Sequence, residues 1–211
     1  MPTKKKGSFI TFEGCEGSGK STQLALLKEH FVKNGIDAMF TREPGGTVIS
    51  EKLREIILSS EFSEMNDRTE ALLYAAARVQ LIDEKIAPYV EKGGIVVCDR
   101  YIDSSFAYQA FARGLGMEYV KSINSYAIEN RMPDATIFFD ISPEEAFGRK
   151  GGAEKGDRLE QSGMEFHDKV YRGYLEICRL YPERIVVIDA HGSAEEIFVK
   201  VIDALKKRGI I

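Results

Sequence analysis

The feature that most constrains this chain lies near its N-terminus, where a short apolar run passes directly into a glycine-rich loop. The apolar run covers residues 8–12, and the loop reads Gly14-Cys15-Glu16-Gly17-Ser18-Gly19-Lys20-Ser21. This loop matches the spacing G-x-x-x-x-G-K-[ST], and Leu24, Leu27 and Phe31 follow it at helical spacing. A strand that enters such a loop and continues as a helix is the context in which this spacing binds nucleotide phosphates.

The rest of the chain alternates between short apolar runs and longer helical patterns. Further buried strands are predicted at residues 38–41, 95–98, 136–139 and 185–188. Helical spacing of apolar residues is found at residues 53–57, 67–91, 166–177 and 197–205. Nearly continuous apolar runs fit strands that are buried on both faces of a parallel sheet. The alternation predicts an α/β fold of the P-loop NTPase type, with about five parallel strands flanked by helices.

Length, charge and cysteine content narrow the class of protein. The 211 residues suit a single domain, and the net charge of −4 argues against a broad nucleic-acid-binding surface. The longest apolar run, residues 71–77, is far shorter than the roughly 20 residues of a membrane-spanning helix. Cys15, Cys98 and Cys178 have no metal-binding spacing and suit a reducing compartment. We therefore expect a cytoplasmic protein that binds small molecules, not a membrane or a nucleic-acid polymer.

Each residue type in the glycine-rich loop has a part in binding phosphate. Glycines let the backbone curl so that its N–H groups point at the phosphates, and the following helix directs its positive end there. Lys20 can reach the β- and γ-phosphates of ATP, and Ser21 can place its hydroxyl on Mg²⁺. ATP and Mg²⁺ are therefore the expected ligands of the loop and of Thr22 beside it. The sequence has no Asn-Lys-x-Asp motif of GTPases and is short for a motor, which favours a small-molecule kinase.

Cationic residues stand at the ends of two further predicted strands. Arg42 precedes Glu43-Pro44-Gly45-Gly46, and Asp99-Arg100 follows the run at residues 95–98. Ligands of open α/β sheets gather outside the carboxyl ends of the strands. Arg42 and Arg100 are therefore predicted to hold an anionic acceptor, and Asp99 to lie near Mg²⁺. On residue type alone, ordinary ion pairs remain an alternative for all three side chains.

Four stretches of the chain, in order and spacing, resemble the bacterial thymidylate (dTMP) kinases. They are residues 12–22, 41–46, 72–78 and 99–109, of which the last reads Asp-Arg-Tyr-Ile-Asp-Ser-Ser-Phe-Ala-Tyr-Gln. The resemblance implies transfer of the γ-phosphoryl group of ATP to dTMP, giving dTDP and ADP. It also implies a homodimer built on long helices.

The same resemblance implies roles for individual residues. Glu16 would accept a hydrogen bond from the 3′-hydroxyl of dTMP, and Tyr108 would crowd the ribose 2′ position. Tyr74 would stack on thymine, and Arg78, one helical turn further, would donate to a thymine carbonyl. The other substrate-binding residues implied are Arg42, Pro44, Arg54, Arg100, Ser104, Ser105 and Gln109. Without the resemblance, Tyr74 is an ordinary core aromatic and the two serines an N-cap of a helix.

A polar, glycine-rich and cationic segment at about residues 148–161 is predicted to form a small mobile lid. The phosphate-binding loop contains no arginine, and relatives of this type carry their catalytic arginine in the lid. The resemblance therefore implies catalytic roles for Arg149 and Arg158, beside Lys20 and Arg100. Which of the two lid arginines reaches the transferred phosphoryl group is left open by the sequence.

Two alternative functions also follow from the residues. The first is a kinase for a nucleoside or another nucleoside monophosphate. A nucleoside acceptor needs a carboxylate base, and Glu13 could serve as one. The second is a nucleotide-binding module without turnover. The complete set of Lys20, Ser21, Asp99 and Arg100 argues against the second alternative.

Overall fold

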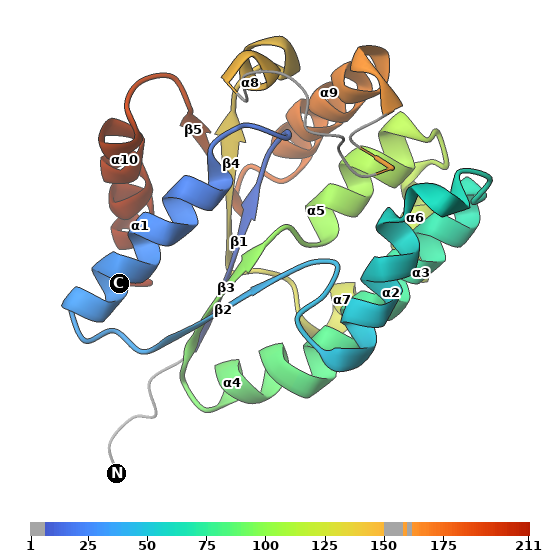
Figure 1. The fold of residues 1–211 in the computed structure, drawn as a ribbon. Coiled ribbons are helices and arrows are strands. Elements are labelled where there is room, and N and C mark those ends of the chain that lie inside the picture. Colours follow the sequence, from blue (N-terminus) through green and yellow to red (C-terminus); the bar gives the residue numbers. More distant parts are fainter. Residues whose placement is uncertain (1–6, 150–157, 160–161) are drawn as a thin grey trace.

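A five-stranded parallel sheet in the order β2-β3-β1-β4-β5 runs through the centre of the molecule (Figure 1). The structure is a computed structural model that describes residues 7–149, 158–159 and 162–211. The strands are β1 (Ser8–Glu13), β2 (Ala38–Arg42), β3 (Ile95–Asp99), β4 (Ala135–Asp140) and β5 (Ile185–Asp189). All five were predicted from sequence, each one or two residues shorter than observed, and the α/β fold is confirmed.

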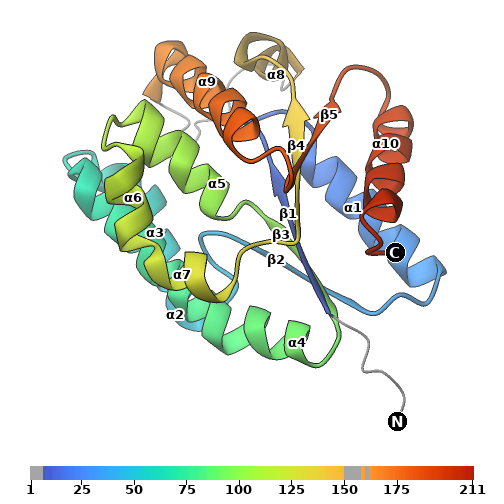
Figure 2. The same cartoon turned by 180° about the vertical axis from the view of Figure 1, so that it is seen from behind.

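Helices cover both faces of this sheet (Figures 1 and 2). The α-helices are α1 (Lys20–Lys33), α2 (Val48–Leu58), α3 (Asp67–Leu81), α4 (Ala87–Glu91), α5 (Ile102–Ser105), α6 (Met117–Ile123), α7 (Ser125–Asn130), α8 (Pro143–Arg149), α9 (Met164–Leu180) and α10 (Ala194–Lys207). A 3₁₀ turn, η1 (Ser60–Phe62), and two π-helical stretches, η2 (Ile82–Ile86) and η3 (Phe106–Ala112), complete the order. Within the described part of the chain, no helix has the length and apolarity that crossing a membrane requires.

The sheet separates two apolar cores. Successive side chains of a strand point to opposite faces, so Phe9 joins the core under α3, η3 and α9, while Ile10 joins the core under α1 and α10. Both side chains are fully buried. Burial on both faces explains why the strands appear in the sequence as continuous apolar runs.

Strand register brings the predicted site residues to one edge of the sheet. Asp99 at the end of β3 pairs with Arg42 on one side and with Phe12 on the other. The glycine-rich loop leaves β1 one residue after this point. All the parallel strands end at this edge, which is where ligands of open α/β sheets bind.

The helical stretch predicted at residues 67–91 consists of α3, η2 and α4 in succession. Its apolar residues do not identify its buried side. Leu72 and Ala76 are exposed, whereas Glu70 and Arg78 are buried. The buried side of α3 carries polar residues because each has a charged partner there, as described below.

Only the ends of the predicted lid belong to the described residues. Arg149 is the last residue of α8, and Arg158 and Leu159 follow later in the chain. The predicted lid at residues 150–157 and 160–161 lies outside the described residues.

Candidate active site

A cavity of about 440 Å³ opens where the glycine-rich loop meets the carboxyl ends of β2 and β3. This volume is in the range of pockets that bind small molecules. The predicted residues that line it are Glu16, Gly17, Ser18, Gly19, Lys20, Ser21, Thr22, Arg42, Pro44, Arg54, Tyr74, Arg78, Asp99, Arg100, Ser104, Ser105, Tyr108, Gln109 and Arg149. Three other predicted residues, Gly14, Cys15 and Arg158, are not part of the lining.

The glycine-rich loop adopts a backbone that an ordinary residue could not follow. Gly17 has a φ of 77°, and a Cβ atom there would lie 2.4 Å from the carbonyl oxygen of Ala146. The loop leads into α1 at Gly19, and no side chain of the described residues caps that helix. Its first turn contains no acidic residue. The N–H groups at the start of α1 are therefore available to an anion.

Lys20 lies buried under the loop. Its ammonium group donates to the carbonyl oxygens of Gly14 at 3.0 Å and Cys15 at 2.8 Å. Burial lowers the pKa of Lys20, and the nearby charge of Arg100 lowers it further. Burial also raises the pKa of the Cys15 thiol to about 11, so this cysteine is an inert part of the loop.

Arg100 is held in place from several directions. It is a non-glycine residue with a φ of 65°, in the left-handed region that costs a side chain energy. One guanidinium nitrogen donates to the carbonyl of Gly14 at 3.1 Å, to Ser104 at 3.3 Å and to Tyr174 at 3.2 Å. The other nitrogen forms an ion pair with Glu16. Because these contacts fix the side chain, Arg100 is a preorganised cation in the cavity wall.

A buried carboxylate supports the neighbours of Arg100. Glu13, at the end of β1, accepts hydrogen bonds from the Tyr101 amide at 2.7 Å, the Ser104 hydroxyl at 2.6 Å and the Tyr174 hydroxyl at 2.9 Å. Desolvation, with a contribution from Asp103, raises the pKa of Glu13 to about 7. Glu13 does not line the cavity. It therefore orients the groups that hold Arg100 rather than facing a ligand.

Two further arginines stand at the rim of the cavity. Arg42 forms an ion pair with Glu51 at 2.9 Å and stays half exposed. Glu51 also accepts from the Gly46 amide at 2.8 Å, which ties the loop after β2 to α2. Arg54 of α2 donates to the carbonyl of Pro44 at 2.9 Å, beside the cis Glu43–Pro44 bond.

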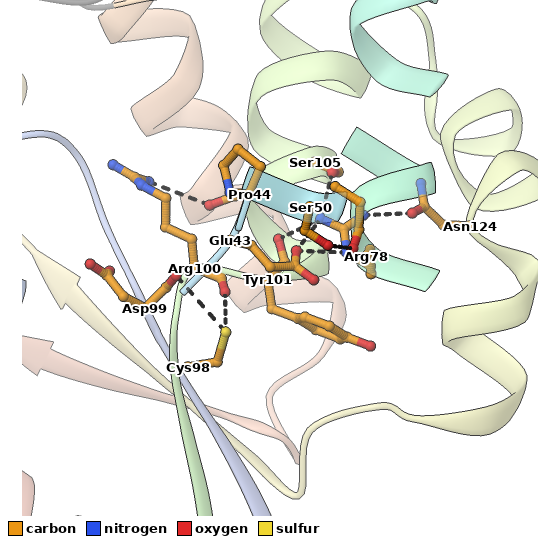
Figure 3. A network of polar contacts seen from close by, with 12 residues as sticks. Glu43, Pro44, Ser50, Arg78, Cys98, Asp99, Arg100, Tyr101, Ser105 and Asn124 are labelled. Carbon is orange, nitrogen blue, oxygen red and sulfur yellow. Dashed lines mark hydrogen bonds and ion pairs between the residues drawn. The ribbon is translucent and has the colours of Figure 1, made fainter. Parts of the chain in front are cut away.

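Arg78 lines the cavity, is almost fully enclosed and lies in a network of polar contacts (Figure 3). It forms an ion pair with Glu43 at 2.7 Å and donates to Asn124 at 2.5 Å, to Ser105 at 3.0 Å and to the Tyr101 carbonyl at 3.2 Å. These contacts among described residues use four of the five N–H groups of a guanidinium. The remaining N–H group, on Nη1, has no acceptor among the described residues.

Tyrosines and a glutamine close the other side of the cavity. The centre of the Tyr108 ring lies 5.4 Å from the guanidinium carbon of Arg100. Tyr74 is partly exposed on α3 and lines the cavity, so it is not a simple core aromatic. Ser104 and Ser105 lie in α5, whose N-cap residue is Tyr101; Ser105 is the N-cap residue of η3 but makes no side-chain capping hydrogen bond there. The Gln109 amide nitrogen donates to Glu70 at 2.9 Å.

The residues predicted to hold Mg²⁺ lie close to the phosphate-binding loop. One carboxylate oxygen of Asp99 is buried and has no hydrogen-bond partner among the described residues. Ser21 is exposed at the start of α1, and both residues line the cavity. No group of three or more potential ligand side chains occurs in the described ranges. This sparse set fits Mg²⁺, which takes one or two protein ligands and completes its shell with phosphate and water.

The two predicted lid arginines lie in different places. Arg149 lines the cavity and donates to the carbonyl of Ala190 at 3.0 Å. Arg158 instead forms an ion pair with Glu70 at 2.5 Å and donates to the Ile57 carbonyl at 3.0 Å. The structure therefore brings Arg149, and not Arg158, to the other cationic groups of the cavity.

Sequence reasoning did not single out several residues of the site. Those that line the cavity are Glu43, Leu58, Tyr101, Leu159 and His167. Others act from behind the lining, namely Glu70, Asn124 and Tyr174. Glu43 and Tyr101 adjoin the predicted Pro44 and Arg100, so position alone could have identified them. The remaining residues come together only through the fold.

Comparisons with known proteins identify the family. The family model described as "Thymidylate kinase" matches residues 12–201. The chain is 48% identical over 202 residues to a thymidylate kinase from Caldanaerobacter subterraneus subsp. tengcongensis, covering 96% of each chain. It is 46% identical over 203 residues to a thymidylate kinase from Finegoldia magna, covering 96% of this chain and all of the relative.

A solved structure agrees with the sequence comparisons. The crystal structure of thymidylate kinase from Ehrlichia chaffeensis superimposes with a TM-score of 0.76 at 30% identity, covering 95% of this chain and 98% of that one. The resemblance predicted from four stretches of sequence thus extends over nearly the whole chain. The chain belongs to the thymidylate kinase family.

Proposed function

We propose that this protein transfers the γ-phosphoryl group of ATP to dTMP, giving dTDP and ADP. The observation that carries the proposal is the fixed position of Arg100, which faces one cavity together with Lys20, Arg42 and Arg149. The reaction brings two polyanions together, so its main requirement is cationic charge at defined positions. Membership of the thymidylate kinase family gives the acceptor its identity.

The acceptor phosphate would bind between Arg42 and Arg100, with Arg54 close by. All three side chains line the cavity, and each has a carboxylate or carbonyl partner that limits its motion. A phosphate oxygen is already anionic near neutral pH and needs no strong base to attack ATP. Catalysis by these residues is therefore electrostatic, through charge balance and alignment.

The thymine base would lie between Tyr74 and the polar groups at the base of the cavity. Tyr74 would stack on the ring, Arg78 would donate its remaining N–H to a base carbonyl, and Gln109 would face the base edge. Ser104 and Ser105 support this pocket through their contacts with Arg100 and Arg78.

The deoxyribose would lie beside Glu16 and Tyr108. Glu16 would accept from the 3′-hydroxyl, and the buried Tyr108 would leave no room for a 2′-hydroxyl. Pro44, held in a cis bond, forms part of the cavity wall near Arg54.

The donor ATP would bind with its phosphates on residues 14–22. When bound, Mg²⁺ would neutralise phosphate charge, and the fit of Ser21 and Asp99 supports its presence there. Lys20 would leave its present carbonyl partners for the β- and γ-phosphates. Arg149 is the better placed of the two predicted lid cations, since Arg158 is paired with a buried carboxylate.

The contacts of Glu13 argue against a nucleoside kinase. A catalytic base must reach the hydroxyl that it deprotonates. Glu13 is fully buried, accepts its hydrogen bonds from protein groups and does not line the cavity. The cations Arg42 and Arg100 would also have no phosphate to bind in a nucleoside.

We also propose that the protein is a cytoplasmic homodimer. Large apolar side chains of α2 and α3 are exposed, among them Val48 at 80% and Leu72 at 50%. Exposed apolar patches on helices often mark protein interfaces. The three cysteines, all unpaired, suit a reducing compartment.

The function is tested by measuring ADP release from ATP with Mg²⁺ across a panel of acceptors. The panel contains thymidine, dTMP, dUMP, dCMP and dAMP. We expect dTMP to give the highest kcat/KM and thymidine to give none. Preference for thymidine would identify a nucleoside kinase, and no acceptor-dependent release would identify a binding module.

A further inference from the structure

We propose that Glu70 is a positioning residue that sets which end of the Gln109 amide faces the substrate base. In this way it would select pyrimidines that carry an N–H group at ring position 3. Glu70 does not line the cavity, and the proposed reaction does not use it directly. The inference rests on the proposed binding of a pyrimidine monophosphate in this cavity.

Glu70 is a fully buried carboxylate in the first turn of α3. Its Oε1 atom accepts from the Gln109 amide nitrogen at 2.9 Å. Its Oε2 atom accepts from Arg113 at 3.1 Å and from Arg158 at 2.5 Å. Two of the three partners of this buried carboxylate are guanidinium groups, and these ion pairs offset part of the cost of burying its charge.

An ionised carboxylate can only accept hydrogen bonds. The NH₂ end of the Gln109 amide must therefore face Glu70, and the carbonyl end must point away from it. Gln109 lines the cavity, and its carbonyl oxygen has no partner in the part of the chain that the structure describes. Gln109 lies in the π-helical segment η3 and meets α3 through its contact with Glu70. Glu70 thus converts an ambiguous amide into a hydrogen-bond acceptor at the cavity wall.

An acceptor at this wall distinguishes pyrimidine bases by their edge. Thymine and uracil carry an N–H donor at position 3, whereas cytosine carries a lone pair there. A fixed carbonyl oxygen bonds the first two and repels the third. Arg78 reads a different atom of the base through its own fixed contacts and does not touch Glu70. Changing Glu70 should therefore change the part of selectivity that depends on position 3.

The test compares kcat/KM and calorimetric dissociation constants for dTMP and dCMP in matched variants. Glu70→Gln lets the amide of Gln109 turn over, since a glutamine at position 70 can pair with either end. We expect the preference for dTMP over dCMP to fall by about tenfold. Glu70→Asp keeps an acceptor-only group and should keep the preference, although activity with both substrates falls. Glu118→Gln, at a side chain that is 94% exposed, is the control for loss of one negative charge.

Glu70→Gln leaves two arginines facing a neutral group, so the variant can fail to fold. The double variant Glu70→Gln/Arg113→Met removes one positive and one negative charge together and serves in that case. An unchanged dTMP preference in a folded variant lacking the carboxylate overturns the proposal. So does an equal loss of preference in Glu70→Asp, which would indicate packing alone. If the unmodified protein accepts neither pyrimidine monophosphate, the proposed function itself is wrong.

Discussion

At the scale of single residues, the cavity depends on side chains that the protein itself holds in place. Arg100 is fixed by Glu16, Ser104 and Tyr174, and Arg78 by Glu43. Such preorganisation means that little reorganisation is needed when charge develops during the reaction. It also means that the supporting residues matter as much as the cations.

The strained backbone of Arg100 gives a paired prediction. Arg100→Ala and Arg100→Gly should both lose at least about 10³-fold in kcat/KM for dTMP, because the fixed cation is removed. A φ of 65° costs glycine little energy but strains alanine. The free energy of unfolding of the glycine variant should therefore exceed that of the alanine variant by about 1 kcal/mol. Urea unfolding and the ADP-release assay measure both effects. Near-normal turnover in either variant would contradict the role of Arg100.

Glu16 is predicted to serve the acceptor more than the donor, although it stands in the phosphate-binding loop. Glu16→Gln removes both the proposed acceptor for the 3′-hydroxyl and the ion pair with Arg100. The affinity for dTMP should therefore fall more than the affinity for ATP. Calorimetric titration with each nucleotide measures the two effects separately. An equal loss for both would assign Glu16 to phosphate or metal binding.

Glu13 should make the stability of the protein depend on pH. Its pKa is raised from 4.5 to about 7 in the folded protein. Between these values the folded protein keeps a proton that the unfolded chain has lost, so the free energy of unfolding falls as pH rises. The full effect is roughly 3 kcal/mol. The side chain of the Glu13→Gln variant does not titrate. The free energy of unfolding of this variant, measured with urea at pH 5 and pH 8, should therefore not show this decrease. If the free energy of unfolding falls equally with pH in both proteins, Glu13 is not the source of the pH dependence.

The sequence allowed the residues of the cavity lining to be predicted better than those behind it. Lys20, Arg42 and Arg100 follow strands, and a parallel sheet must gather strand ends at one edge. Glu70 and Tyr174 contact Gln109 and Arg100 only after helices have packed against one another. Their positions depend on helix rotation and side-chain packing, which local sequence patterns do not specify.

At the scale of elements, the strands were predicted closely and the faces of the helices less well. The strands are mostly apolar, and the central ones are buried almost throughout, so their boundaries are visible in the sequence. On α3 the apolar residue Leu72 is exposed while the charged residue Arg78 is enclosed. Apolar periodicity does not identify the buried face of a helix when ion pairs fill that face. It also fails when exposed apolar residues form another face, here the one proposed to bind a second subunit.

The exposed apolar side chains of α2 and α3 form the face to which the second subunit is proposed to bind. Leu72→Glu should convert the proposed dimer to a monomer, because a charge would be buried at the interface. Val199→Glu on α10 is the matched control, since Val199 is 59% exposed on a different helix. Sedimentation analysis of both variants measures the effect. A Leu72→Glu protein that keeps the same mass as the unmodified one would rule out this face.

At the scale of the whole molecule, net charge and local charge differ. The chain carries a net charge of −4, yet Arg42, Arg54, Arg100 and Arg149 all line one cavity with Lys20. A net negative charge weakens the attraction of the whole protein to nucleic acids. A local cluster of cationic side chains can still bind a small anion. The sheet makes this possible because it collects residues that are far apart in sequence at one edge.

The most direct measurement follows the label from [γ-³²P]ATP into equal concentrations of dTMP and thymidine, with the unmodified protein and with Arg100→Ala. We expect label in dTDP alone, and its loss in the variant while ATP binding persists, because Arg100 is proposed to hold the acceptor phosphate. Label in dTMP formed from thymidine, label chiefly in inorganic phosphate, or undiminished dTDP in the Arg100→Ala protein would contradict this expectation.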